Sequence, residues 1–144
     1  MAIKPKPDDY HSVTPYLVVE GVPKLMDFLK EVFGAEEKEK MALPDGKIMH
    51  AEMRIGDSVV MMGEAGGENK PMPGFLYVYV EDTDETYQRA LRAGAMSVRE
   101  PKNEFYGDRN AGVRDACGNL WWIATHVEDV SDEEMQRRAA EQRG

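Results

Sequence analysis

The chain repeats one pattern twice, and this duplication limits what it can fold into more than any other feature. The segment YLVVEG at residues 16–21 corresponds to YVYVED at residues 77–82, and Gly34-Ala35 corresponds to Gly94-Ala95. The offset of about sixty residues is too long for a solenoid repeat and suits duplicated βαβββ halves. The sequence therefore predicts an α+β fold built from two tandem βαβββ units.

The first unit is expected to span residues 12–63. Pro23 follows a strand-like segment and stands where a helix can begin. Apolar residues then recur with helical spacing up to Gly34, which suits the end of a helix. The strands expected in this unit are residues 12–20, 36–43, 48–55 and 58–62.

The second unit is expected to span residues 74–126, after a loop rich in Gly and Pro. Asp82 with Glu85 forms a capping box, and Gly94 ends the helix that follows. The strands expected here are residues 75–80, 97–100, 111–115 and 120–125, and a short helical tail is expected over residues 130–143. Residues 1–144 are expected to form one domain.

Charge and composition exclude several classes of partner. The chain has 144 residues, 42% of them hydrophobic, and a net charge of -9. An acidic surface of this kind repels nucleic acid and anionic membranes. The segment MAIKPKPDDYH lacks the apolar stretch of a signal peptide, so a cytoplasmic protein is expected. The single cysteine, Cys117, excludes a disulfide within one chain.

Five segments in this order resemble a known superfamily: TPYLVVEG, FLKEVFGAEE, HAEMRIGDSVVM, YGDR and the closing D..GN.WWIATH. The sequence resembles the vicinal oxygen chelate superfamily, which includes glyoxalase I, extradiol dioxygenases and bleomycin-resistance proteins, and within it the PhnB-like group. The resemblance implies an open curved β-barrel with helices outside, a cavity between the halves, and a homodimer. The sequence departs from the common DPFGH turn at Ala116, Cys117 and Asn119.

Family enzymes hold a divalent metal with one residue from the first and one from the last strand of each unit. The resemblance places these positions at Thr14, Phe75, Trp122 and either Val60 or Met61. Such side chains do not supply a divalent-metal site. No metal and no other cofactor is therefore expected, and an apolar cavity suits an apolar or aromatic ligand.

Three polar features have alternative interpretations. His50 and Glu52 share a strand face and are either an acid/base or metal-binding pair, or part of an exposed sheet face. Arg109 of YGDR either clamps an anion or ties a loop to the barrel rim, and the neighbouring Phe105 either covers the cavity or packs. His11 and His126 are expected at the surface.

The sequence thus predicts a metal-free protein that binds a small, partly aromatic or apolar molecule. The alternative is a metal-dependent lyase, isomerase or dioxygenase with His50 and Glu52 as displaced ligands. Trp122 is expected to face the cavity, and Trp121 the opposite side, because strand side chains alternate. The expected ligand-binding residues are Thr14, Tyr16, His50, Glu52, Val60, Phe75, Tyr77, Tyr79, Phe105, Arg109 and Trp122.

Overall fold

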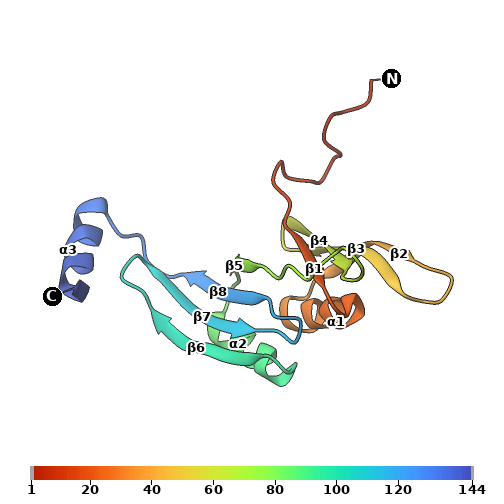
Figure 1. Ribbon diagram of the computed structural model, residues 1–144. Helices are drawn as coiled ribbons and strands as arrows, with labels where there is room; N and C mark the ends of the chain where they lie inside the picture. Colours follow the sequence, from red (N-terminus) through yellow and green to blue (C-terminus); the bar gives the residue numbers. More distant parts are fainter. Residues whose placement is uncertain (1, 144) are drawn as a thin grey trace. The chain divides into compact units, whose positions relative to one another are not determined.

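The computed structural model describes residues 2–143 and contains the two expected βαβββ units, followed by a third helix (Figure 1). The elements of the first unit are β1 (Tyr16–Val19), α1 (Val22–Phe33), β2 (Glu36–Ala42), β3 (Ile48–Ile55) and β4 (Ser58–Glu64). Those that follow are β5 (Phe75–Tyr79), α2 (Thr83–Arg92), β6 (Met96–Asn103), β7 (Asp108–Arg114), β8 (Leu120–His126) and α3 (Asp132–Arg143).

The strands form two four-stranded sheets with the same topology, in the orders β1-β4-β3-β2 and β5-β8-β7-β6. In each sheet the first strand runs parallel to the last, and the remaining pairs are antiparallel. The α+β class and the tandem arrangement are therefore confirmed. The chain divides into two compact units, one with the residues up to 74 and residues 116–119, the other with residues 75–115 and those from 120 onward.

In the first unit, α1 packs its apolar side on one face of the sheet. Pro23 stands in its first turn, and Gly34 closes it in the left-handed conformation, with φ 64°. Leu25 and Leu29 of α1 are buried together with Met53 of β3 and other apolar residues of the strands. The side chains buried between α1 and this sheet face form the hydrophobic core of the first unit.

In the second unit, α2 covers the equivalent sheet face. Asp82 accepts a hydrogen bond from the backbone N–H of Glu85 at 3.1 Å, as the capping box predicts. Trp121 and Ile123 of β8 are fully buried. The indole N–H of Trp121 donates to Asp115 at 2.8 Å, so this large side chain is buried without leaving its polar atom unpaired.

Several strand boundaries differ from the prediction, and β7 begins at Asp108 and not at residue 111. β1 begins at Tyr16 and not at residue 12, so Thr14 lies before the strand. Pro15 has no backbone N–H group to donate to a neighbouring strand. β6 continues through Pro101 to Asn103, although the sequence predicted its end at Glu100. A proline is tolerated here because β6 is an edge strand and its register shifts between Arg99 and Lys102.

No helix within residues 2–143 combines the length and the apolar character that a membrane crossing requires.

Candidate functional site

Four aromatic residues lie together on the sheet face of the second unit that does not pack against α2. They are Phe75, Tyr77 and Tyr79 of β5 and Trp122 of β8, and we call them the aromatic face. The parallel pairing of β5 with β8 places Tyr77 opposite Trp122. The ring of Phe75 stacks on Trp122 with centroids 5.6 Å apart. Phe75 is 64% exposed and Tyr79 is 62% exposed, so the face is open to a ligand.

The indole of Trp122 is held between neighbours on two strands. Trp122 pairs with Gly112 of β7, and a Cβ atom at Gly112 would overlap with its six-membered ring. The guanidinium carbon of Arg99 lies 5.0 Å from the Trp122 ring centroid, a cation–π contact. Glycine at 112 therefore makes room for the indole to lie close to the sheet.

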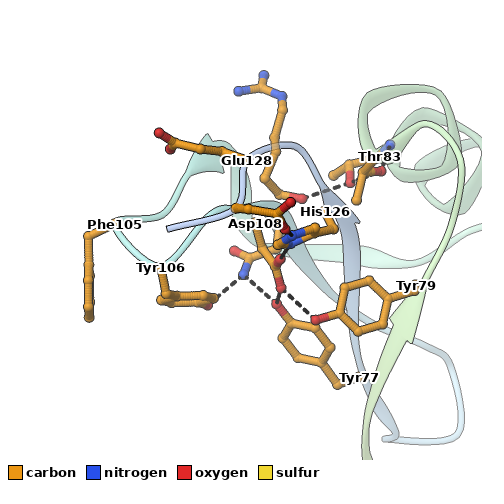
Figure 2. Close-up of polar contacts among 12 residues, drawn as sticks. Tyr77, Tyr79, Thr83, Phe105, Tyr106, Asp108, His126 and Glu128 are labelled. Carbon is orange, nitrogen blue, oxygen red and sulfur yellow. Dashed lines mark hydrogen bonds and ion pairs between the residues drawn. The ribbon is translucent and has the colours of Figure 1, made fainter. Parts of the chain in front are cut away.

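Asp108 is the centre of a polar cluster beside these rings (Figure 2). Its Oδ2 accepts hydrogen bonds from the hydroxyls of Tyr77 at 2.6 Å and Tyr79 at 2.8 Å. Its Oδ1 lies 2.9 Å from Nδ1 of His126, whose Nε2 lies 2.7 Å from Asp129. One carboxylate of β7 thus fixes two tyrosines of β5 and a histidine of β8.

These contacts change the acidity of the whole cluster. Burial acts to raise the pKa of Asp108, but the bonds from Tyr77, His126 and Tyr79 outweigh it and hold the pKa below its usual range. Burial and the bond to Asp108 raise the pKa of Tyr77, and the bond to Asp108 raises that of Tyr79. Bonds to Asp129 and Asp108 raise the pKa of His126. The tyrosines therefore stay protonated as donors at neutral pH.

Asn110 links the cluster to Arg99. Its amide donates to the hydroxyl of Tyr77 at 3.1 Å and to that of Tyr106 at 2.8 Å (Figure 2). Its carbonyl oxygen accepts a hydrogen bond from Nη2 of Arg99. The same nitrogen lies 2.6 Å from the buried carboxylate of Glu104. Asn110 is fully buried, and its hydrogen bonds with Tyr77, Tyr106 and Arg99 fix its orientation.

Arg109 lies between Asp108 and Asn110 in the sequence, and its side chain has different neighbours. Its guanidinium binds Asp84 of α2 through two hydrogen bonds, at 2.7 and 2.9 Å, and Asn103 at 3.2 Å. Strand alternation explains this, because adjacent side chains of β7 point to opposite faces. Arg109 thus ties β7 to α2.

The first unit has a polar counterpart on the equivalent sheet face. Nε2 of His50 lies 2.9 Å from Glu52, and Nδ1 lies 3.2 Å from the hydroxyl of Tyr16. The hydroxyl of Tyr10 also donates to Glu52, and this bond raises the pKa of Tyr10 to about 12. Burial acts to raise the pKa of Glu52, but the bonds from His50 and Tyr10 lower it overall.

A groove of about 580 Å³ lies between this face and the N-terminal arm, residues 5–14. It is lined by Pro5, Lys6, Pro7, Tyr10, His11, Ser12, Thr14, Glu39, Glu52 and Met61.

The strand registers relate the two units residue by residue. Tyr16 pairs with Met61 as Tyr77 pairs with Trp122. The counterpart of Trp122 is therefore Met61, whereas Val60 is 3% exposed and lies in the core. The four positions at which family enzymes hold a metal carry Thr14, Met61, Phe75 and Trp122, a set that does not fit a divalent ion. Among residues 2–143, no three His, Cys, Asp or Glu side chains are grouped to bind a metal.

The residues predicted for a ligand site fall into separate groups. Phe75, Tyr77, Tyr79 and Trp122 come together on the aromatic face, and Tyr16, His50 and Glu52 in the first unit. Phe105 packs edge-on against Tyr106, with centroids 5.3 Å apart, and its carbonyl oxygen accepts a bond from Arg138 of α3.

Sequence reasoning missed Asp108, Asn110, Arg99 and Tyr10 as members of these clusters. It correctly placed His126 at the surface, where its side chain is 51% exposed, but it did not predict that both ring nitrogens contact carboxylates. The alternation of Asp108 and Asn110 along β7 was the available signal, because it places both on one face.

Comparison with known proteins identifies the family. Residues 10–123 match the sequence profile of the Glyoxalase/Bleomycin resistance protein/Dioxygenase superfamily. The chain is 32% identical to the uncharacterized protein Mb0911c of Mycobacterium bovis, over 99% of this chain and 98% of that protein.

Solved structures agree with this match. The crystal structure of TioX from Micromonospora sp. ML1 is similar at a TM-score of 0.68 and 28% identity, covering 81% of this chain and 99% of TioX. A PhnB protein from Bacillus cereus, described as a putative 3-demethylubiquinone-9 3-methyltransferase, shares the fold at a TM-score of 0.64 and 16% identity, over 80% and 99% of the two chains. The chain therefore belongs to the glyoxalase/bleomycin resistance/dioxygenase superfamily.

Proposed function

We propose that this protein binds a small, partly aromatic or apolar organic molecule on the aromatic face of its second unit, without a metal ion. One observation carries the proposal: Phe75 and Trp122 form a stacked pair, and Phe75 remains 64% exposed. A planar ligand that covers these rings would remove apolar surface from water, which favours binding in proportion to the area buried. Aromatic pairs add a further contribution from their stacked or edge-on geometry.

The polar cluster supports this proposal because it holds the rings in place before a ligand arrives. Tyr77 and Tyr79 share one acceptor, Asp108, and Gly112 lets Trp122 lie close to the sheet. Side chains that are already ordered lose little entropy on binding. The face thus suits recognition by shape and ring contact, which needs no catalytic group.

The residues at the family's metal positions support a metal-free mode of binding. Phe75 and Trp122 have no metal-binding atoms, and a methionine stands at the counterpart of Trp122 in the first unit. An apolar surface of this kind does not stabilise an unpaired dication.

The test is equilibrium dialysis with 2-methylnaphthalene, a neutral aromatic probe. We expect saturable binding to the unmodified protein and a loss of affinity of at least about tenfold, or ~1.4 kcal/mol, in Trp122→Leu. Met49→Leu is the matched control, because Met49 is 43% exposed on β3 of the first unit. If Trp122→Leu and the unmodified protein bind 2-methylnaphthalene with equal affinity, the aromatic face is not the binding site.

A second candidate function is a metal-dependent lyase, isomerase or dioxygenase with displaced ligands. The observation in its favour is the contact of 2.9 Å between His50 and the buried Glu52. Metal analysis of protein purified without a chelating tag separates the candidates. Stoichiometric metal that is lost in His50→Ala would favour the enzyme, whereas no metal uptake from Ni, Zn, Mn or Fe would exclude it.

We also propose that the protein forms a homodimer. Exposed apolar side chains on the edge strands support this, namely Met41 of β2 at 62% and Met96 of β6 at 71%. Sedimentation equilibrium should give twice the mass of the chain, and Met41→Asp or Met96→Asp should shift the equilibrium toward the monomer. A monomer at all concentrations would contradict the proposal.

A further inference from the structure

Resting on the proposed function, we propose that the ligand of the aromatic face carries a carboxylate beside its aromatic ring, and that Arg99 selects it. The guanidinium carbon of Arg99 lies 5.0 Å from the Trp122 ring centroid, in a cation–π contact. A ligand that stacks on Phe75 and Trp122 therefore has its edge within reach of a fixed guanidinium group.

The guanidinium has hydrogen-bonding capacity to spare. Its contacts to Asn110 and Glu104 both use Nη2. Nε is buried without a hydrogen-bond partner, and Nη1 has none among the described residues. Arginine carries five N–H donors in a planar fork that matches a carboxylate. Most of this fork is unused by the protein.

Trp122 adds a second free donor. Its indole N–H has no hydrogen-bond acceptor within the part of the chain that the structure describes, whereas the N–H of Trp121 is paired with Asp115. Indole nitrogen can only donate. Arg99 and Trp122 together therefore present donors to whatever lies on the rings.

Most hydrogen-bond acceptors of the same region are already engaged. Asp108 accepts hydrogen bonds from Tyr77, Tyr79 and His126. The side-chain carbonyl oxygen of Asn110 accepts a hydrogen bond from Arg99. The phenol oxygen of Tyr77 accepts from Asn110, which leaves that of Tyr79 as the spare acceptor of the aromatic face. A donor-rich ligand such as an amine would find few acceptors, and its charge would face that of Arg99.

Glu104 does not cancel this preference. Its carboxylate lies on Nη2, and its side chain is only 9% exposed, so a ligand on the rings meets the guanidinium and not the glutamate. The buried Glu104 fixes the position of Arg99, as a supporting charge orients a binding group.

The test compares three probes with one ring system: 2-naphthoate, 2-methylnaphthalene and 2-naphthylmethylamine. Equilibrium dialysis is expected to show that 2-naphthoate binds at least about tenfold more tightly than 2-methylnaphthalene and that the amine binds most weakly. Arg99→Gln should abolish the preference for naphthoate, measured as the ratio of the affinities of that one variant for 2-naphthoate and 2-methylnaphthalene. Arg99→Lys should retain part of it, because the charge remains without the planar fork.

Arg92→Gln is the matched control, since Arg92 of α2 is 61% exposed and pairs with Glu85 on the surface. Circular dichroism confirms that each variant is folded. If all three probes bind equally, or if Arg99→Gln keeps the preference, the role of Arg99 is overturned while the proposed function stands. If 2-naphthylmethylamine binds most tightly, the proposal that the ligand carries a carboxylate is overturned. If no probe binds, both the inference and the proposed function fail.

Discussion

Gly112 lies directly beneath the indole of Trp122, on the strand that pairs with it. Trp122, at one of the four positions where family enzymes hold a metal, thus needs a glycine at position 112 to pack closely on the sheet. The first unit differs at the equivalent pair, where Glu52 stands opposite Met61. The duplicated framework therefore carries two different surfaces, one aromatic and one with a buried carboxylate.

Gly112→Ala tests the placement of Trp122. The added methyl group would overlap with the indole, so the ring must tilt away from the sheet. We expect a loss of stability of about 1–3 kcal/mol from overpacking, together with weaker binding of 2-methylnaphthalene. Urea unfolding and equilibrium dialysis measure the two effects. Gly66→Ala is the control, because a Cβ atom there meets nothing within 4 Å; unchanged behaviour of Gly112→Ala would contradict the close packing.

Asp108→Asn tests the polar cluster. An amide cannot accept all three hydrogen bonds that Tyr77, Tyr79 and His126 direct at the carboxylate. We expect a loss of about 1–3 kcal/mol in the free energy of unfolding, since Asp108 is buried. Asp57→Asn, at the exposed turn between β3 and β4, should change stability little. Equal stability of the two variants would show that the cluster does not stabilise the unit.

The stability of the protein should depend on the protonation of His126. Its pKa is raised by Asp129 and Asp108, so the charged imidazole stabilises the fold below the ordinary histidine pKa of about 6.5. This contribution is lost as the pH rises through the raised pKa. Unfolding free energies from about pH 6 to about pH 9 should fall less steeply in His126→Gln than in the unmodified protein. Identical pH profiles would contradict this role, and His11→Gln serves as the control variant.

Arg109→Ala should reduce stability but not binding. Its guanidinium is held by Asp84, a residue whose side chain is 54% exposed, so the pair is worth about 0.2–1 kcal/mol. A double-mutant cycle with Asp84→Ala in urea measures this coupling. Dialysis with 2-naphthoate should give the same affinity before and after the substitution. A tenfold loss of that affinity would instead assign Arg109 the anion clamp that the YGDR segment suggests.

The sequence predicted most of the fold because its signals were local. The repeat beginning at Tyr16 and Tyr77 gave the tandem units, and Pro23, Gly34 and Asp82 marked helix ends that the structure retains. The errors came where tertiary context prevails over local preference. Pro101 suggested the end of a strand, but an edge strand needs no N–H at that position.

The candidate site was predictable in part. The alternation of Phe75, Tyr77 and Tyr79 correctly placed these rings on one face, because a strand has a period of two. The role of Asp108 was not predictable, since its partners come from β5 and β8 and depend on strand register. Arg99 reaches Trp122 across β7, a contact between residues that no local pattern connects.

The most direct measurement of the central claim is the affinity of 2-methylnaphthalene for protein stripped of metal by a chelator, compared with protein supplied with Ni, Zn, Mn or Fe. Mass spectrometry of the elements confirms that the stripped sample holds none of them. We expect equal affinity in all samples and a loss of at least about tenfold in Trp122→Leu under each condition. Binding that appears only after a metal is added, or that survives intact in Trp122→Leu, would contradict metal-free recognition on the aromatic face.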